Sequence, residues 1–189
     1  QTYVLTPKRK TKPKKDGKEC VETLLSANHL NPLLRDIANP PSADKQFFKT
    51  GTRIFREGDR VVNLKNTAEV LNGEVGYVEK IEKSDVVLVT VNYDGVKVEY
   101  SPDRLRELDL AYALTVHKVQ GCEYASVIYP TSVTHGAMMQ RNLLYTAVTR
   151  AKKSVVILGS KSSLEKTIKT VKSKVKQDLL SARIQVYSK

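Results

Sequence analysis

Two segments constrain this chain more than any others, because each joins a buried element directly to a run of polar side chains. Residues 114–123, LTVHKVQGCE, change from an apolar strand to polar and small residues within a few positions. Residues 141–153, RNLLYTAVTRAKK, carry apolar side chains at helical spacing and have Thr149 and Arg150 near their end. Proteins of the α/β class place ligand contacts in loops at the ends of such elements. The two segments therefore predict an α/β protein with a ligand-binding site at the ends of these elements.

Apolar runs of strand length alternate with helical patterns on both sides of the middle of the chain. Strands are predicted at residues 2–5, 110–116, 123–130 and 154–160. The last of these, SVVILGS, is apolar enough for the middle of a parallel sheet. Helices are predicted at residues 17–30, 137–151, 161–172 and 174–183. Asn31 and Pro32 should end the first helix, because a residue before proline avoids the helical region.

From about Arg53 the pattern changes to the short alternating runs of an antiparallel β module. Strands are predicted at residues 59–64, 74–81, 85–91 and 96–100. The pairs Asn72-Gly73 and Asp94-Gly95 suit tight turns, since Gly has no Cβ to clash at positive φ. Residues 101–105 are either a further strand or a single 3-10 turn. A small β-barrel or sandwich is therefore expected between two halves of an α/β domain.

The charge of the chain indicates a polyanionic partner. Its 189 residues include 32 Lys and Arg against 20 Asp and Glu, which gives a net charge of +12. The cations crowd residues 8–18 and 161–176. Nucleic acid is the usual partner of so basic a chain, and the alternative is a solvated loop and a solvated helix face.

Composition also argues against some classes of protein. No apolar stretch is long enough to cross a membrane and there is no signal peptide, so we expect a soluble, cytoplasmic protein without a membrane partner. Three scattered His residues and no Cys-x-x-Cys predict no zinc site.

Residues 114–123 and 141–153 match two long sequence patterns. T-x-H-K-x-Q-G-x-E is matched by Thr115, His117, Lys118, Gln120, Gly121 and Glu123. R-N-L-L-Y-T-A-x-T-R-A-K is matched by Arg141, Asn142, Leu143, Leu144, Tyr145, Thr146, Ala147, Thr149, Arg150, Ala151 and Lys152. These runs resemble motifs five and six of superfamily 1 DNA helicases, and most closely the RecD-like branch. The family usually has Ser where this chain has Val119.

The resemblance implies a definite architecture. It implies a RecA-like parallel-sheet motor domain with a UvrD-like C-terminal domain, interrupted by a small all-β SH3-like barrel. The GDRVVNLKN…NGEVGYV run resembles the start of that barrel. The implied division is 1–50 for the first part of the motor domain, 51–108 for the SH3-like insert, and 109–189 for the remainder with its C-terminal helices.

The resemblance also implies residues that contact the nucleotide. Arg150 resembles the motif-six arginine finger, and Arg9 resembles the motif-four arginine that contacts the same phosphate. Gly121 and Glu123 resemble the motif-five pair that approaches the nucleotide. The alternatives are that Arg150 complements a helix C-terminus, and that Gly121 caps a helix beside the solvated Glu123.

A further set of residues is implied to face single-stranded DNA. It comprises Thr115, His117, Lys118, Gln120, Tyr145 and Thr149. Hydroxyl, imidazole and ammonium groups all suit phosphate oxygens and carry no sequence code. The alternatives are a buried core histidine at His117 and simple packing at Tyr145.

The implied function is the C-terminal half of an ATP-dependent DNA helicase that moves 5′→3′ along a single strand, in DNA repair or recombination. The chain has no G-x-x-x-x-G-K-[ST] sequence and begins with Gln, so ATP and Mg²⁺ are expected to bind mainly to an N-terminal motor domain of the same protein. This piece alone should be inactive.

Subunits of a nuclease complex are possible partners. The SH3-like insert would hold a DNA strand or serve as a spacer. The alternative functions are a non-catalytic basic nucleic-acid-binding module with an SH3-like domain, and the helicase part of a relaxase-helicase.

Overall fold

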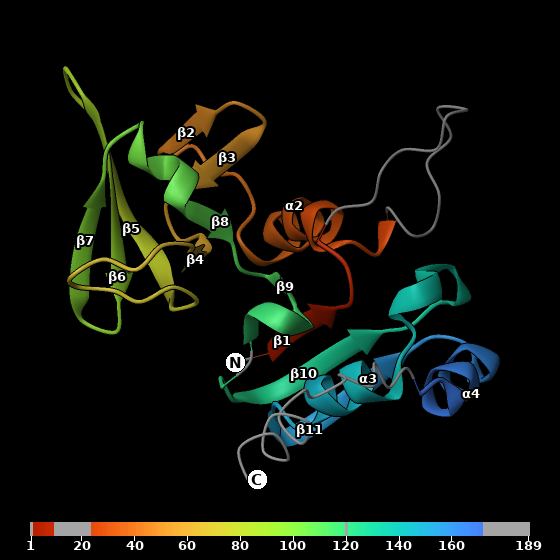
Figure 1. Cartoon of the computed structure of the whole chain (residues 1–189). Helices are drawn as coiled ribbons and strands as arrows, with labels where there is room; N and C mark the ends of the chain where they lie inside the picture. The colour runs from red at the N-terminus through yellow and green to blue at the C-terminus, as the bar shows by residue number, and fades with distance from the viewer. Residues whose placement is uncertain (1, 10–23, 120, 172–189) are drawn as a thin grey trace, which may run out of the picture.

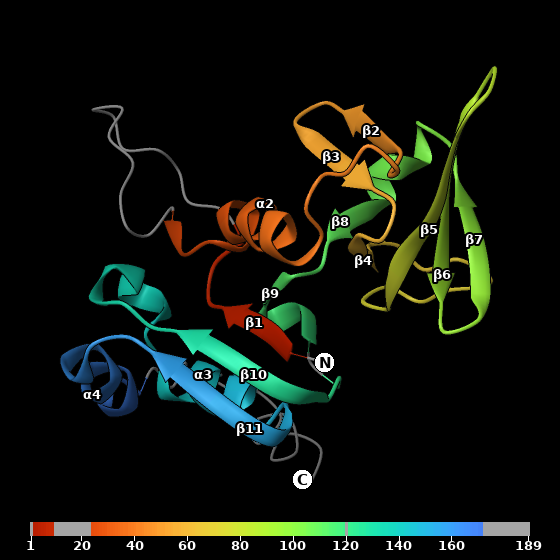
Figure 2. The same cartoon turned by 180° about the vertical axis from the view of Figure 1, so that it is seen from behind.

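The computed structural model describes residues 2–9, 24–119 and 121–171. A parallel sheet with helices and an antiparallel all-β unit stand side by side in both views (Figures 1 and 2). This arrangement confirms the predicted class, an α/β RecA-like domain with a small SH3-like barrel. No helix among the described residues is long and apolar enough to span a membrane.

The parallel sheet is built from strands at both ends of the chain. Within the described residues its order is β11-β10-β1-β9, with β1 (Thr2–Thr6), β9 (Ala113–Thr115), β10 (Tyr124–Pro130) and β11 (Ala151–Leu158). Each neighbouring pair is parallel. Its core contains buried Leu5, Leu114, Val127, Tyr129 and Leu144. Between the strands lie η2 (Val116–Val119), η3 (Val133–Met138) and α3 (Arg141–Val148), and α4 (Lys161–Lys169) follows β11.

The antiparallel sheet contains the four strands that alternation predicted. Its order is β7-β6-β5-β4-β8, with β4 (Arg60–Asn63), β5 (Val75–Lys83), β6 (Val87–Tyr93), β7 (Val96–Tyr100) and β8 (Leu108–Leu110). Asp94 and Gly95 both have positive φ, 53° and 102°, as a two-residue hairpin turn requires. Residues 101–105 were expected to form either a strand or a 3-10 turn. The structure has a 3-10 turn, η1 (Arg104–Glu107).

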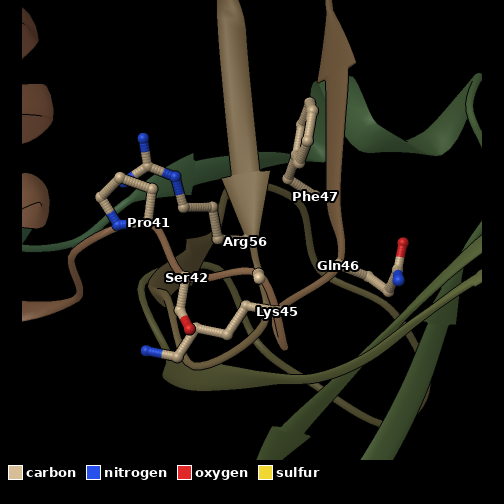
Figure 3. Close-up of a pocket in the computed structure, with 7 residues that line it drawn as sticks. Pro41, Ser42, Lys45, Gln46, Phe47 and Arg56 are labelled. Atoms are coloured by element: carbon tan, nitrogen blue, oxygen red, sulfur yellow. The ribbon is translucent and has the colours of Figure 1, made fainter.

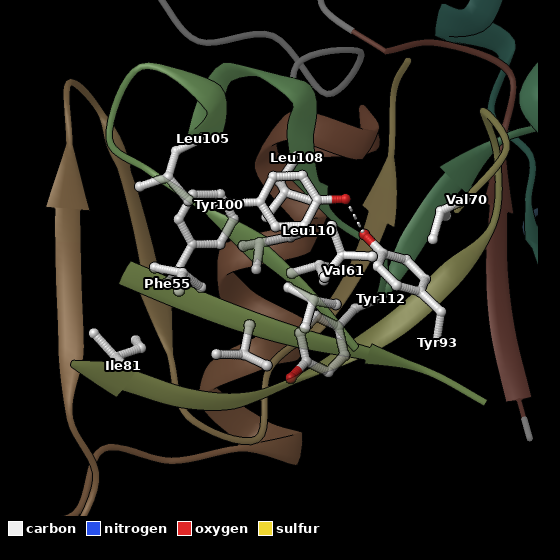
Figure 4. Close-up of a cluster of buried hydrophobic side chains, with 14 residues drawn as sticks. Phe55, Val61, Val70, Ile81, Tyr93, Tyr100, Leu105, Leu108, Leu110 and Tyr112 are labelled. Atoms are coloured by element: carbon white, nitrogen blue, oxygen red, sulfur yellow. Dashed lines mark hydrogen bonds between the residues drawn. The ribbon is translucent and has the colours of Figure 1, made fainter. Parts of the chain in front are cut away.

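The barrel core is rich in aromatic residues (Figure 4). The hydroxyls of Tyr93 and Tyr100 are 2.9 Å apart in its interior. Burial is the main reason that the pKa of Tyr93 lies far above its usual value. A buried hydroxyl needs a partner, and the two tyrosines provide one for each other.

Arg60 joins the barrel to the parallel sheet. Its guanidinium lies over the rings of Tyr3 and Tyr112, at 4.6 Å and 5.4 Å from their centroids. Its Nη1 donates to the backbone oxygen of Thr2 at 3.0 Å. Stacking and hydrogen bonding by one planar cation therefore tie β4 to β1.

One predicted strand is in fact two. Residues 110–116 divide between β8, where Leu110 pairs with Val61, and β9, where Ala113 pairs with Val4. The Tyr112 side chain enters the barrel core, and its hydroxyl donates to Asp59 at 3.2 Å. An apolar run cannot reveal that its two ends serve different sheets.

The first predicted helix is also placed differently. Residues 17–23 of it lie outside the described residues, and α2 (Ala27–Ala38) continues through Pro32 rather than ending before it. Proline removes one helical hydrogen bond. Tertiary contacts offset the loss, because buried Arg35 donates from Nη1 to the Ile54 oxygen at 2.8 Å.

The C-terminal elements are shorter or more exposed than predicted. The helix expected at 137–151 covers only Arg141–Val148, because Gln140 is extended and Ala151 already pairs with Tyr124 in the sheet. The strand expected at the middle of the sheet, β11, is an edge strand among the described strands, with Leu158 exposed. The helix expected at 161–172 is α4, and that at 174–183 lies outside the described residues.

A hairpin that the sequence analysis did not predict precedes the barrel. Strands β2 (Phe47–Thr50) and β3 (Arg53–Arg56) pair antiparallel around Gly51, whose φ is +59°. The signal was present in FFKTGTRIFR, where two strand-like runs flank a Gly.

Candidate nucleotide and single-strand sites

Arg150 lies in the turn between α3 and β11, at the amino end of the parallel sheet. Its Nε donates to the Thr146 oxygen at 3.3 Å, and its Nη1 donates to the Cys122 oxygen at 3.2 Å. Its Nη2 lies 3.5 Å from the Thr149 hydroxyl. Three of the five N–H groups thus bond to described residues, and the side chain is half-buried rather than enclosed.

Arg150 thereby performs the helix-capping role that was its structural alternative. It donates to a carbonyl in the last turn of α3, where cations are favoured. The same guanidinium also holds the motif-five loop through Cys122. Capping does not exclude a nucleotide contact, since the guanidinium remains partly exposed, and the predicted role stays a prediction.

The motif-five loop brings Gly121 and Glu123 to the same end of the sheet. Gly121 has a φ of +90°, a conformation that favours glycine, and a Cβ added there would meet no atom within 4 Å. Glu123 is exposed and pairs with Lys152 at 2.9 Å. The hydrogen bond from Lys152, with a smaller effect of Arg150, lowers the pKa of the Glu123 carboxyl, so this carboxylate is ionised at neutral pH.

A second cluster of charge lies at the other end of the sheet. Arg9 follows β1, and its Nη2 is 3.0 Å from the Asp109 carboxylate. Lys118 lies half-buried nearby in η2, and burial together with the charges of Arg9 and Arg53 lowers the pKa of its ammonium. Arg53 reaches this region from the β2–β3 hairpin and donates to the Leu108 oxygen at 2.7 Å. Lys118 thus lies near two other cations, Arg9 and Arg53, and near one carboxylate, Asp109, which pairs with Arg9.

The backbone around Arg9 is fixed by α2. The first N–H groups of this helix, at Ala27 and Asn28, donate to the oxygens of Lys8 and Arg9 at 2.9 Å and 3.1 Å. These bonds satisfy donors that a helix N-terminus otherwise leaves open. The backbone of Arg9 is therefore held in place by hydrogen bonds, although the residue follows the end of β1.

Thr115 and His117 differ in their exposure. Thr115 is 8 % exposed at the end of β9, whereas His117 is exposed in η2. The alternative that His117 is a buried core histidine is therefore wrong. Gln120 lies outside the described residues. Strand β9 itself is held by Asn31, whose amide both donates to and accepts from the Ala113 backbone at 2.9 Å and 2.7 Å.

Tyr145 and Thr149 lie one turn apart on the exposed side of α3. Tyr145 is 69 % exposed, which contradicts the alternative that it packs in the interior. The Thr149 hydroxyl donates to the Thr146 oxygen at 3.1 Å, as helix-terminal threonines commonly do. Both side chains are therefore accessible to a binding partner.

The sheet register separates the two arginines. Thr2 of β1 is level with Ser126 of β10, and Tyr124 is level with Ala151, the residue after Arg150. With a rise of about 3.3 Å per residue, the carboxyl end of β1 lies roughly 20 Å from that level. Arg150 and Arg9 therefore lie at opposite ends of the sheet, Arg150 at the amino ends and Arg9 at the carboxyl ends of the strands. The loop after β9 joins the two ends, with Lys118 near Arg9 and Glu123 near Arg150.

The two ends of the sheet provide cations, hydrogen-bond donors and the carboxylates of Glu123 and Asp109. Among the described residues, no group of three or more His, Cys, Asp or Glu side chains is arranged to hold a metal ion. The sequence analysis missed Asp109, Arg53 and Asn31. Motif spacing gives no signal for them, because they meet the other residues only through the fold.

Two families match parts of the chain. Residues 110–158 match the UvrD-like helicase C-terminal domain. Residues 30–93 match the ATP-dependent RecD-like DNA helicase SH3 domain.

Sequence relatives include helicases and helicase subunits. The ATP-dependent RecD2 DNA helicase of Deinococcus radiodurans is 39% identical over 145 residues, which are 74% of this chain and 19% of that protein. The RecBCD enzyme subunit RecD of Buchnera aphidicola is 21% identical over 175 residues, 85% of this chain and 29% of that protein. The chain thus spans between about a fifth and a third of these relatives.

Solved structures give the same fold. Bacteroides Pif1 bound to single-stranded DNA has a TM-score of 0.54 at 15% identity, over 100% of this chain and 46% of that one. Bacteroides Pif1 in complex with ADP-AlF3 and single-stranded DNA has a TM-score of 0.55 at 15% identity, over 100% and 45%.

Proposed function

The chain belongs to the RecD-like branch of superfamily 1 DNA helicases, whose UvrD-like C-terminal and SH3 domains it carries, and we propose that it is the C-terminal motor half of an ATP-driven enzyme. The observation that supports this most is the position of Arg150. It is a partly exposed guanidinium that is fixed at one end of a RecA-like sheet and joined to the motif-five loop.

Arg150 is proposed to act on the nucleotide that another domain binds. A planar, permanently charged fork meets two phosphate oxygens at once, and charge spreads over these oxygens in phosphoryl transfer. Pre-ordering by the Thr146 and Cys122 oxygens removes much of the cost of orienting the side chain. Glu123, an ionised carboxylate at the same end, would accept from a ribose hydroxyl, and Gly121 would allow close approach of the backbone.

The residues present fit only part of a site for ATP and Mg²⁺. Arg150 and Glu123 suit the outer oxygens and the ribose, while the described chain provides no cluster of metal ligands. Bound ATP would supply the phosphoryl group whose transfer powers the motor. The phosphate-cradling loop and the Mg²⁺ carboxylates are proposed to come from an N-terminal motor domain of the same protein.

The opposite end of the sheet is proposed to hold single-stranded DNA. Thr115, His117 and Lys118 would meet the phosphates at this end, and Gln120 is included in the same proposal. Tyr145 and Thr149 are also proposed to contact DNA, but from the exposed face of α3 beside Arg150. Exposed His117 and half-buried Lys118 provide donors without a sequence code. Arg9 was predicted to contact the nucleotide. Its position beside Lys118 favours a contact with single-stranded DNA instead.

Coupling between the two ends would run through the loop of residues 116–123. One end of this loop carries His117 and Lys118, and the other is bonded to Arg150 through Cys122. A shift of Arg150 toward a phosphate would pull on this loop and alter the grip on the strand. Movement 5′→3′, a role in repair or recombination, and partners in a nuclease complex belong to the same proposal.

Reconstitution tests this function against its main rival. The 189-residue chain would be mixed with the N-terminal motor domain, and ATP hydrolysis measured with and without single-stranded DNA. The proposal predicts no turnover by either piece alone and DNA-stimulated turnover by the mixture. A non-catalytic basic binding module would show full, salt-sensitive DNA affinity alone and no turnover in the mixture. A relaxase-helicase would pass this test and differ only by a nickase elsewhere in the parent protein.

A further inference from the structure

The outer face of the β2–β3 hairpin exposes a large aromatic ring. Phe47 is 54% exposed, while the next residue, Phe48, packs against the barrel core. Alternation along the strand sets this division, since Phe48 and Phe55 face inward and Phe47 faces outward. A single exposed apolar residue is ordinary by itself, so the surroundings of the ring decide what it could bind.

Cations surround this ring. The Lys83 ammonium lies 4.9 Å from the centroid of Phe47. Arg56 is directly opposite Phe47 in the hairpin register, and exposed Lys49 lies two residues along the same face. Arg56 is held in place by Asp36 at 2.7 Å and by the Asn39 oxygen at 3.3 Å. The ring is therefore set among lysine ammonium groups and one arginine, Arg56, which is fixed in orientation and whose charge is partly offset by Asp36.

A hollow of about 450 Å³ opens beside the ring (Figure 3). Described residues line it, including Ser42, Lys45 and Gln46 in addition to Phe47 and Arg56, and none of these lining residues is acidic. Lys45 donates to the side chain of Asn39, which directs it along the wall. The volume falls within the range of small-ligand sites, which is about 300–1,000 Å³.

From this juxtaposition we propose that the hairpin face is a second binding site for single-stranded nucleic acid. A base would stack on Phe47, and the flanking phosphates would meet Lys45, Lys49 and Lys83. Aromatic stacking combined with a cationic track is how proteins bind single strands without reading their sequence. The site lies on the hairpin that precedes the barrel, not at the ends of the parallel sheet, so it goes beyond the DNA contacts proposed above and stands without them.

The barrel contains a matched contrast to Phe47. Tyr77 of β5 is also an exposed aromatic residue, at 41%. The hollow beside it is lined by Glu79 and Asp94, which would repel phosphates. If exposure of an aromatic ring were sufficient, Tyr77 would bind nucleic acid as well as Phe47; the charge of the surroundings distinguishes the two.

Titration of a fluorescent deoxythymidine oligonucleotide with the 189-residue chain tests this site. Phe47→Ala should weaken binding by about fivefold or more, the loss typical of one stacked base, whereas Phe47→Trp and Tyr77→Ala should bind like the parent. The double variant Lys49→Ala/Lys83→Ala should lower the slope of log affinity against log salt by about 0.7 per lost contact. Because Phe47 and Tyr77 are both exposed, the variants at these positions should have the same melting temperature as the parent chain.

Two further arms keep this inference separate from the proposed function. An oligonucleotide with 5-iodouracil should cross-link on irradiation to the peptide containing Phe47 and not to that containing Tyr77. In a His117→Ala/Lys118→Ala background, Phe47→Ala should still weaken binding by the same factor. Unchanged affinity of Phe47→Ala in both backgrounds would overturn the hairpin site and leave the sheet-end proposal untouched. Unchanged affinity of the His117→Ala/Lys118→Ala variant alone would count against the sheet end only.

Discussion

Val61 and Val62 are neighbours in β4, yet their side chains belong to two different hydrophobic cores. Val61 is buried with Phe55, Val78 and Leu105 in the barrel. Val62 is buried with Leu5 and Leu114 beneath the parallel sheet. One strand therefore serves both units, and the insert is joined to the motor half by packing as well as by its two chain connections.

This sharing predicts that the two units unfold together. Val61→Ala and Val62→Ala should each lower the free energy of unfolding by roughly 2 kcal/mol, since each removes buried methyl groups and leaves a cavity. Amide hydrogen exchange, followed separately in β6 and in β10, should detect the same loss of protection in both strands for either variant. Loss confined to β6 in Val61→Ala, with β10 unaffected, would contradict a shared core.

Asn31 is predicted to be essential for holding β9. Its amide is 6 % exposed and makes two hydrogen bonds with the Ala113 backbone. Asn31→Asp loses the donor and sets a carboxylate against a carbonyl oxygen, which should cost about 1–3 kcal/mol. Asn28→Asp, on the exposed side of the same helix, is the control and should melt almost unchanged. Equal melting temperatures for the two variants would refute the role of Asn31.

Affinity for single-stranded DNA should fall as the pH rises toward 10.5, the ordinary pKa of a lysine side chain. Burial, followed by the charges of Arg9 and Arg53, lowers the pKa of Lys118 in the free chain. A phosphate would favour the protonated ammonium, so binding is strongest below the free pKa and weakens as pH rises through it. Lys118→Arg stays charged throughout and should remove that pH dependence. A parent chain whose affinity does not change over this range would argue against Lys118 as a phosphate contact.

Sequence patterns located the elements whose neighbours in the chain are also their neighbours in space. The strands β4 to β7 and the turn at Asp94 and Gly95 follow from alternation and turn chemistry, both of which are local. The division of residues 110–116 between two sheets, and the continuation of α2 through Pro32, depend on partners distant in sequence such as Val61 and Ile54. Local signals cannot contain that information.

The site divides in the same way. The two polar runs drew attention to Arg150, Glu123 and Lys118, and their roles were expected from the family resemblance. They could not indicate that Asp109 pairs with Arg9, or that Arg53 approaches from an unpredicted hairpin, because these side chains meet only after three segments have folded. They also gave no sign that Arg9 and Arg150 lie at opposite ends of the sheet.

The role of Arg150 is tested most directly by steady-state ATP hydrolysis of the intact helicase with saturating single-stranded DNA. Arg150→Gln is the informative variant, because its amide can still donate to the Cys122 oxygen while the charge is lost. The account predicts that kcat falls by about a thousandfold or more, as for other arginine fingers, while the variant melts and binds DNA like the parent. A folded Arg150→Gln enzyme that hydrolyses ATP at the parent rate would contradict it.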